Sequence, residues 1–328
     1  MKKNWLIFLW LIAPCVVTAQ TVYDRAYVLP FEKNNDIEAY TGFRNAVFRF
    51  RPKVDDTLIT RHKLMANTSA SFGVAFDYNW LSIDYSFSIP GTAVANQAPT
   101  IHTWELHLKK TGPHFRAGID ITRYLGLVMP LDRRTQSFDY FHDIVYRRYG
   151  LEFTFILNAE KFALPAGTGF SMRQRRSAGS LIITALPFYQ RFSLSRNPQN
   201  GYSQKDSAFL DAVGNNPDAL SMLVRTGYAY TRVWQEGLYS VHGSVEAGTG
   251  LQDRWPRLGQ PAIRPIFNYR LALTAGYNGD QWYGYFRAAY EKWRTYQVGS
   301  VMNTRNDNFG ITVGYRIGQW KRKIFGVL

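Results

Sequence analysis

The sequence has almost no cysteine, few charged residues and no long apolar run. Its one cysteine is Cys15, so neither a disulfide framework nor a thiolate metal site can be built from the rest of the chain. The mean hydropathy of −0.26 excludes a bundle of membrane-spanning helices, since each helix would need about 20 apolar residues. Aromatic residues, in contrast, make up 16% of the 328 residues, more than a disordered chain carries. The chain therefore folds, but not through apolar helices.

The start of the sequence has the pattern of a secretory signal peptide. Two lysines precede an apolar run over 5–17, and small residues follow it. We predict a signal peptide over 1–19, with cleavage after Ala19. The alternative is a lipoprotein acylated at Cys15, which the proline directly before that residue disfavours. The sequence carries a net charge of +15, so an exported chain of this kind suits anionic lipid rather than nucleic acid.

The rest of the chain alternates apolar and polar residues, which is the period of a β-strand with two different faces. In one such stretch Leu81, Ile83 and Tyr85 alternate with serine and aspartate. The polar face is rich in Gly, Ser and Thr and carries charges in mid-strand, whereas a soluble sandwich would show more Lys and Glu. A membrane barrel turns such a face into its lumen and its apolar face into lipid. The alternation recurs over 69–78, 81–89, 114–121, 148–157, 222–234, 239–247, 267–277 and 309–318.

Tight turns and longer loops alternate along the chain, as in bacterial outer-membrane barrels with their short periplasmic turns and long outer loops. The sequence therefore predicts an all-β fold, a closed antiparallel transmembrane β-barrel over 39–320. Residues 20–38 would form a periplasmic N-terminal segment, and 321–328 a basic periplasmic tail. We expect tight turns near 79–80, 110–112, 159–160, 235–237 and 278–280. We expect longer loops near 52–61, 91–100, 123–145, 196–220, 251–263 and 296–306.

The number of strands depends on one stretch of the chain. A single-chain barrel has an even number of strands, with both ends on the periplasmic side. Splitting the region after the turn at 159–160 into strands 161–173, 178–186 and 188–195 satisfies this parity. Pro187 would be the break, because proline cannot donate a hydrogen bond to a strand ladder. This division predicts about 14 strands, and 12 is the alternative.

Four tryptophans are expected at one membrane interface. Trp80, Trp234 and Trp282 lie at or next to tight turns, and Trp320 ends the last strand. Such a placement is typical of the aromatic girdle of a membrane barrel. The alternative is that hairpin tryptophans cap a soluble core, but the signal peptide and the loop asymmetry favour the girdle.

Charges on the polar face are the main candidates for function. Their signs are nearly balanced, so they could form a network of paired charges that fills the lumen, or an eyelet that selects a solute by its sign. We favour the paired network, because a barrel of this size could be filled by its own side chains. The residues with lumen parity are Arg116, Arg148, Arg225, Arg270, Arg287, Arg316, Asp84, Glu105, Asp120, Glu152, Glu246 and Glu291.

The densest basic cluster contains Arg173, Arg175 and Arg176. With the strands divided as above, it lies at a hairpin tip on the outer side of the membrane. Three arginines there could hold phosphates of outer-membrane lipid, including those of lipopolysaccharide. A solvated hairpin end explains the same spacing equally well.

Signals of catalysis or cofactor binding are weak. The sequence contains no HExxH and no GxxxxGK[ST], the patterns of zinc proteases and phosphate-binding loops. A triad can be drawn from Ser240, His242 and Glu246, but any serine-lined barrel offers such choices. We therefore expect no catalytic, cofactor-binding or metal-binding residues, no cofactor and no enzymatic activity.

Three stretches together resemble a known family. They are 79–83 leading into 87–90, then 121–126, and finally Phe170 to Ser180 with its core Gln-Arg-Arg-Ser-Ala-Gly-Ser. These stretches are similar to the domain-of-unknown-function family 4421, found in exported proteins of Bacteroidota, over about 40–320. The resemblance implies an outer-membrane β-barrel. Because the family is uncharacterised, it implies no catalytic or ligand-binding residues.

The sequence leaves several functions open. The leading interpretation is an outer-membrane barrel with a structural or passive transport role and an unknown substrate. The alternative is an envelope binding or assembly partner that acts through extracellular loops 123–145 and 196–220. A lipid-modifying enzyme of the outer membrane is the least favoured interpretation.

Overall fold

The computed structural model describes residues 23–33, 35–51, 63–67, 70–78, 81–95, 103–132, 137–194, 204–216, 218–255 and 263–318. The predicted signal peptide, Trp80, Trp320 and the predicted basic tail lie outside these residues. No helix in the described part of the chain is long and apolar enough to cross a membrane.

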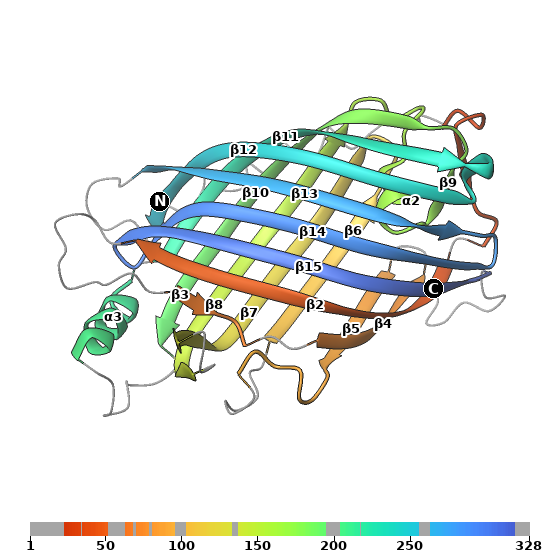
Figure 1. The fold of residues 1–328 in the computed structure, drawn as a ribbon. Helices are drawn as coiled ribbons and strands as arrows, with labels where there is room; N and C mark the ends of the chain where they lie inside the picture. The colour runs from red at the N-terminus through yellow and green to blue at the C-terminus, as the bar shows by residue number, and fades with distance from the viewer. Residues whose placement is uncertain are drawn as a thin grey trace, which may run out of the picture.

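The fold consists almost entirely of antiparallel strands (Figure 1). Between the strands lie two helices, α2 (Leu164–Thr168) and α3 (Gln204–Gly214), and a 3₁₀ turn, η2 (Gln235–Gly237). The strands are β1 (Val28–Pro30), β2 (Asn35–Arg51), β3 (Lys63–Met65), β4 (Ala70–Tyr78), β5 (Leu81–Ser88), β6 (Thr103–Thr111), β7 (Phe115–Asp132), β8 (Ser137–Ile156), β9 (Met172–Gln174), β10 (Ala178–Leu194), β11 (Asp218–Trp234), β12 (Tyr239–Trp255), β13 (Arg264–Asn278), β14 (Trp282–Gln297) and β15 (Ser300–Ile317).

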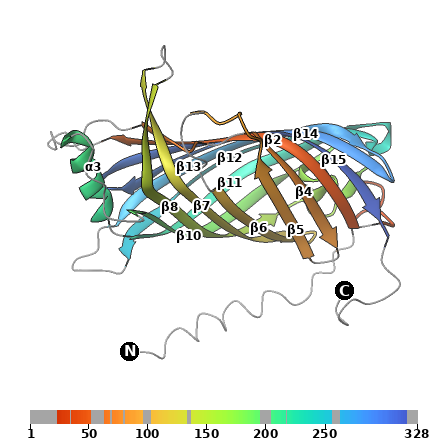
Figure 2. The same ribbon diagram turned by 90° about the horizontal axis from the view of Figure 1, so that it is seen from below.

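The main sheet closes on itself and forms a barrel. Its last strand, β15, pairs with β2 from Val301 opposite Arg51 to Ile317 opposite Asn35. Ten strands form the ring, in the order β15-β14-β13-β12-β11-β10-β8-β7-β3-β2. The hairpin β4–β5 attaches to β2, and β6 attaches to β7 (Figure 2). The predicted closed antiparallel barrel is confirmed, and its first strand begins at Asn35 rather than at residue 39.

The two faces of the strands are those that the alternation predicts. The outward face is a belt of exposed apolar side chains, in which Val245 is 62% exposed, Ile311 55% and Leu271 44%. Inward-facing glycines let neighbouring strands approach closely. A Cβ on Gly250, for example, would lie 2.0 Å from the carbonyl oxygen of Met222. The barrel wall is therefore apolar outside, with a lumen lined by small and polar groups.

Two of the predicted long loops are wrong. Most of 123–145 belongs to β7 and β8, which project as a long hairpin beyond the barrel (Figure 2). The predicted loop 296–306 is a tight turn at Val298 and Gly299, with φ angles of 54° and 65°. Both central residues of a type I′ hairpin turn have positive φ, and such a turn joins twisted strands closely.

The predicted division of 161–195 is also wrong, and with it the count of about 14 strands. β10 runs unbroken through Pro187, which stays in register opposite Met222 of β11. On the other side, the ladder to β8 skips Leu186 and Pro187 and resumes at Phe188 in the same register. Proline lacks the N–H group that would continue this ladder, so it removes a hydrogen bond without ending the strand. Twelve described strands are eight residues or longer, but the closed ring contains ten strands and the others are attached to it.

Candidate functional site

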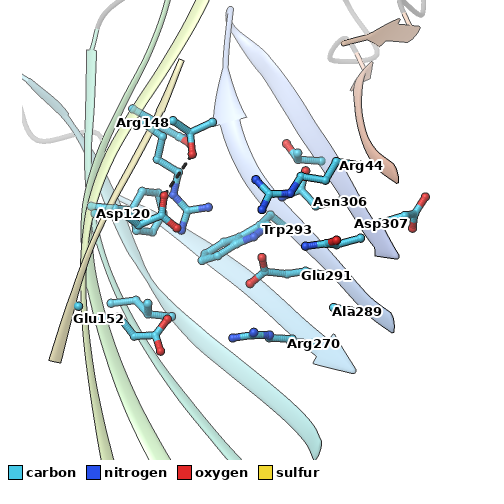
Figure 3. A pocket seen from close by; sticks show the side chains of 18 of the residues that line it. Arg44, Asp120, Arg148, Glu152, Arg270, Ala289, Glu291, Trp293, Asn306 and Asp307 are labelled. Carbon is cyan, nitrogen blue, oxygen red and sulfur yellow. Dashed lines mark hydrogen bonds between the residues drawn. The ribbon is translucent and has the colours of Figure 1, made fainter. Parts of the chain in front are cut away.

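A polar chamber of about 360 Å³ lies inside the barrel, lined by side chains from strands on all sides (Figure 3). Phe48, Tyr124 and Tyr146 line it toward the α3 end. The charged lining residues carry both signs. They are Glu38, Asp77, Asp120, Glu152, Glu291 and Asp307, with Arg44, Arg148, Arg225, Arg270 and Arg287.

Arg225 organises the best-satisfied part of this chamber. Its side chain is 1% exposed, and its Nε atom lies 2.7 Å from Oε2 of Glu246. Its Nη1 atom donates to Oε1 of Glu291 at 3.0 Å and to Oδ1 of Asn268 at 3.1 Å. The Asn268 amide in turn donates to the Glu291 carboxylate at 3.2 Å. One buried guanidinium therefore serves two carboxylates, as the predicted network of paired charges requires.

Two further arginines have partners in the lumen. Arg116 donates to the Glu152 carboxylate and forms an ion pair with it. The Arg148 guanidinium lies 4.2 Å from the ring centre of Trp293 and 4.6 Å from that of Phe188. The ion pair stabilises the charge of Arg116, and the cation–π contacts stabilise that of Arg148.

Arg270 and Arg287 line the chamber in a different way. Among the described residues, neither side chain has an ion pair, a hydrogen bond or a ring contact. The groups whose charges act on Arg287 include the arginines Arg270, Arg44 and Arg116. The guanidinium groups of Arg270 and Arg287 therefore line the chamber without a bonded partner among the described residues.

A plug built from two distant parts of the chain fills the tight-turn end of the barrel. β1 pairs with β9 in a separate two-stranded sheet, with Val28 opposite Gln174. The segment between β8 and β10, which carries α2 and β9, buries Phe162, Leu164 and Phe170. The turn that the sequence predicts near 159–160 is present at 157–161, but it leads into this plug segment and not directly into the next barrel strand.

Gln174 is the central hydrogen-bonding residue of the plug. Its side-chain amide donates to the carbonyl oxygens of Lys161 at 2.6 Å and Arg176 at 2.9 Å, and also to that of Tyr27 at 3.3 Å. Its Oε1 accepts from the backbone N–H of Ala163 at 3.0 Å. Gln174 thereby ties the N-terminal segment to both ends of the plug segment.

Arg316 joins the plug to the barrel wall. Its guanidinium lies between the rings of Phe31 and Tyr283, 3.6 Å and 4.2 Å from their centres. It donates to the carbonyl oxygen of Phe170 at 2.5 Å and to Oδ1 of Asn278 at 2.6 Å. Arg316 has the predicted inward orientation, but it binds plug and turn rather than another lumen charge.

The predicted position of the basic cluster is wrong. Arg173, Arg175 and Arg176 lie at the tight-turn end, not at a hairpin tip on the long-loop side. Arg173 donates to the Asn278 carbonyl at 2.9 Å and pairs with Asp280, and Arg175 pairs with Glu236 at 2.6 Å. Arg176 lies 5.7 Å from the ring centre of Tyr27. These contacts place the cluster in the plug, because β9 pairs with β1 there; that it binds lipid phosphates stays a prediction.

Electrostatics reinforce one contact of this plug. The hydrogen bond from Arg175 and the charge of the same guanidinium hold the pKa of Glu236 below its usual range. Burial raises the pKa of Tyr23, near the start of the N-terminal segment, to about 12. The tyrosine therefore stays neutral and the glutamate stays ionised at neutral pH.

An apolar cluster fills the other end of the lumen, beneath α3. This helix occupies part of the predicted loop 196–220 and contributes Phe209, Leu210 and Val213 to the cluster. The ring of Phe209 lies 5.4 Å from that of Phe50, which in turn lies 5.4 Å from Phe192. Aromatic packing therefore separates the chamber from the α3 end.

The remaining predicted residues divide by position. Trp234 and Trp282 are 47% and 58% exposed beside the turns of the tight-turn end; that they belong to an aromatic girdle stays a prediction. Asp84 and Glu105 lie on β5 and β6, and their side chains are outside the described part of the structure. His242 contacts Thr231 through Nδ1 at 3.0 Å, and no group of three potential metal ligands occurs among the described residues.

Several residues of the site are missing from the sequence-based list. Glu38 accepts hydrogen bonds from the hydroxyls of Tyr283 at 2.8 Å and Tyr285 at 3.3 Å. Arg44 lines the chamber from the same strand. Both are even-numbered in β2, so continuing the alternation through 36–50 would have found them. Gln174 begins the core of the family-like segment, but neither alternation nor spacing indicates its role, because that role depends on tertiary contacts.

The fold and the site define a closed antiparallel β-barrel with an exposed apolar belt and a lumen that its own chain fills at both ends. The chain belongs to the family described as a domain of unknown function (DUF4421), whose model matches residues 22–317. This match confirms the resemblance found in the sequence. No curated protein matches the sequence.

Solved structures with a similar arrangement of strands are bacterial outer-membrane proteins. The outer membrane protease OmpT from Escherichia coli is 11% identical, with 89% of this chain and 100% of that chain covered and a TM-score of 0.36. An outer membrane channel from Pseudomonas putida F1 is 8% identical, with 90% and 99% covered and a TM-score of 0.34. The translocator domain of the autotransporter NalP from Neisseria meningitidis is 9% identical, with 86% and 88% covered and a TM-score of 0.32. These similarities are too distant to support a conclusion about function.

Proposed function

We propose that this protein is an outer-membrane barrel with a structural or restricted transport role and no enzymatic activity. The observation that carries the location is the belt of exposed apolar side chains around the wall, of which Val245 and Ile311 are examples. Keeping this apolar surface in contact with water would cost free energy, whereas lipid would cover it. Export by a signal peptide cleaved after Ala19 is part of the proposal, and N-terminal sequencing of the mature protein tests it.

The contents of the lumen argue against a permanently open pore. The plug held by Gln174 and Arg316 occupies the tight-turn end, and the cluster around Phe50 and Phe209 occupies the other end. A passive channel needs a continuous water-filled path. We infer that the resting barrel conducts little and that transport requires displacement of the plug.

Conductance in planar bilayers tests this proposal. The refolded protein should show little current, and Gln174→Ala should raise it, because the variant loses the hydrogen bonds that hold the plug. Glu160→Ala is a matched control, since this exposed residue lies beside the plug segment without a side-chain contact in the described structure. Large, stable currents from the parent protein that equal those of the variant would overturn the proposal.

A binding or assembly role is the second candidate, supported by the hairpin formed by β7 and β8. It projects beyond the barrel (Figure 2) and exposes Leu131 by 58%. Copurification of envelope proteins with the parent, and their loss when Leu131→Ser is introduced, would support this role. An unchanged set of copurified proteins would count against it.

A further inference from the structure

Some arginines of the chamber have bonded carboxylates, and two others do not. Arg225 has Glu246 and Glu291, and Arg116 has Glu152. Arg270 and Arg287 have no such partner among the described residues, although both line the same cavity. These two arginines lie on adjacent strands, Arg270 on β13 and Arg287 on β14.

The electrostatic surroundings of these two arginines differ. Arg270 lies within the influence of Glu152, Glu246 and Glu291, but none of these acids forms an ion pair with it within 4.0 Å. The charges that act on Arg287 include those of Arg270, Arg44 and Arg116. The positive charges of these three arginines therefore act together on Arg287.

An arrangement of this kind is costly unless something binds to it. A guanidinium offers five N–H donors in a rigid fork, and charged groups inside a protein are normally paired or bound to an ion. The same fork matches the geometry of carboxylate and phosphate oxygens. The cavity of about 360 Å³ falls within the range of small-molecule sites.

We propose that Arg270 and Arg287 form a binding site for the oxyanion group of a small solute, a carboxylate or a phosphate, inside the barrel. Trp293 and Ala289 of β14 line the same chamber and would contact the less polar part of the solute. The Arg270 side chain extends into the chamber between Glu152 and Glu291 (Figure 3). This proposal concerns binding alone and holds whether or not the barrel conducts.

Isothermal titration of the full, detergent-folded protein with inorganic phosphate and with succinate tests the site. We expect at least one of these anions to bind with a Kd below about 1 mM, and sodium chloride at equal ionic strength not to replace it. Arg287→Met should weaken binding at least about tenfold, since it removes charge-assisted hydrogen bonds. Arg287→Lys should also weaken it, because an ammonium group lacks the fork. Arg232→Met, which alters an exposed arginine beside Trp234, should leave the affinity unchanged.

Thermal unfolding provides a second readout that does not depend on the calorimetric signal. The anion should raise the Tm of the parent protein by stabilising the folded state, and this rise should be lost in Arg287→Met. Without anion, Arg287→Met should unfold at a higher temperature than the parent, since it removes a half-buried cation that has no bonded partner among the described residues. Failure of both anions to bind at about 10 mM, or equal affinity of parent and Arg287→Met, would overturn the proposal. Phosphate binding that is lost equally in Arg232→Met would overturn it as well, because the anion would then follow net charge rather than this site.

Discussion

Removing the Arg225 side chain should destabilise the barrel more than removing any exposed arginine. In Arg225→Met, the carboxylate of Glu246 would stay buried at 6% exposure without the cation that lies 2.7 Å away. Glu291 would lose its contact at 3.0 Å as well. Breaking a buried ion pair by removing one partner costs about 3–5 kcal/mol, because the other charge is left uncompensated.

Urea unfolding of the detergent-folded protein, followed by tryptophan fluorescence, measures this loss. Arg305→Met is the matched control, because Arg305 pairs with Asp307 at 2.5 Å while its side chain is 44% exposed. Exposed pairs contribute about 1 kcal/mol or less, so the control should shift the free energy of unfolding only slightly.

A second substitution separates the loss of charge pairing from the loss of packing. Adding Glu246→Gln to Arg225→Met removes the uncompensated charge, so the double variant should recover part of the lost stability. Groups in one network are expected to be non-additive in this way. If Arg225→Met and Arg305→Met lower the free energy of unfolding equally, or if the double variant is less stable than Arg225→Met, the reasoning about a buried charge network is refuted.

Three further predictions follow from the belt, the plug and the topology. Leu271→Arg, near the membrane midplane, should lower the free energy of unfolding by about 2–4 kcal/mol. Asn306→Arg, beside Glu291 in the lumen, should lower it much less. Equal losses of stability in a refolding titration would refute the assignment of Leu271 to lipid and Asn306 to the lumen. The pKa of Glu236 is lowered in the folded protein. Its pairing with Arg175 therefore stabilises the plug at any pH above the pKa of this carboxyl in the unfolded chain. The stabilisation is lost as the pH falls through the pKa of the folded state. The conductance of the parent protein should therefore rise at acid pH, and this rise should be absent in Glu236→Gln. A cysteine at Asp211 should react with an impermeant label on whole cells, and one at Glu236 only after the outer membrane is opened; the reverse pattern would invert the topology.

The facing of the strands could be predicted from the sequence because it depends on a local period. Side chains alternate along a strand regardless of what it pairs with, so Leu271 and Ile311 could be assigned to the outer face before any partner was known. The turn at Val298 could not be predicted. A β-branched residue rarely has a φ of 54°, and here the backbone N–H of Val298 donates to Oδ1 of Asn216 at 2.6 Å, far away in sequence.

The composition of the site could be predicted, but its pairing could not. Parity identified Arg225, Glu246 and Arg270 as lumen residues. Which acid meets which arginine depends on how strands far apart in the sequence pack across the lumen, and Arg225 and Glu291 are separated by 66 positions. The sequence therefore could not distinguish the satisfied Arg225 from Arg270 and Arg287, which have no bonded partner in the described structure.

The segment from Gln174 to Ser180, whose part 176–180 is the most specific piece of the family resemblance, acquires a physical explanation from the plug. The hydroxyl of Ser177 accepts a hydrogen bond from the backbone N–H of Val233 at 3.0 Å, and that of Ser180 accepts from Asn158 at 2.9 Å. A Cβ on Gly179 would lie 2.8 Å from the carbonyl oxygen of Ala229, so only glycine fits between these strands. Together with the hydrogen bonds of Gln174, these contacts fix the point where the chain leaves the plug and enters β10. The pattern of this segment is therefore explained by how the plug is held in the barrel.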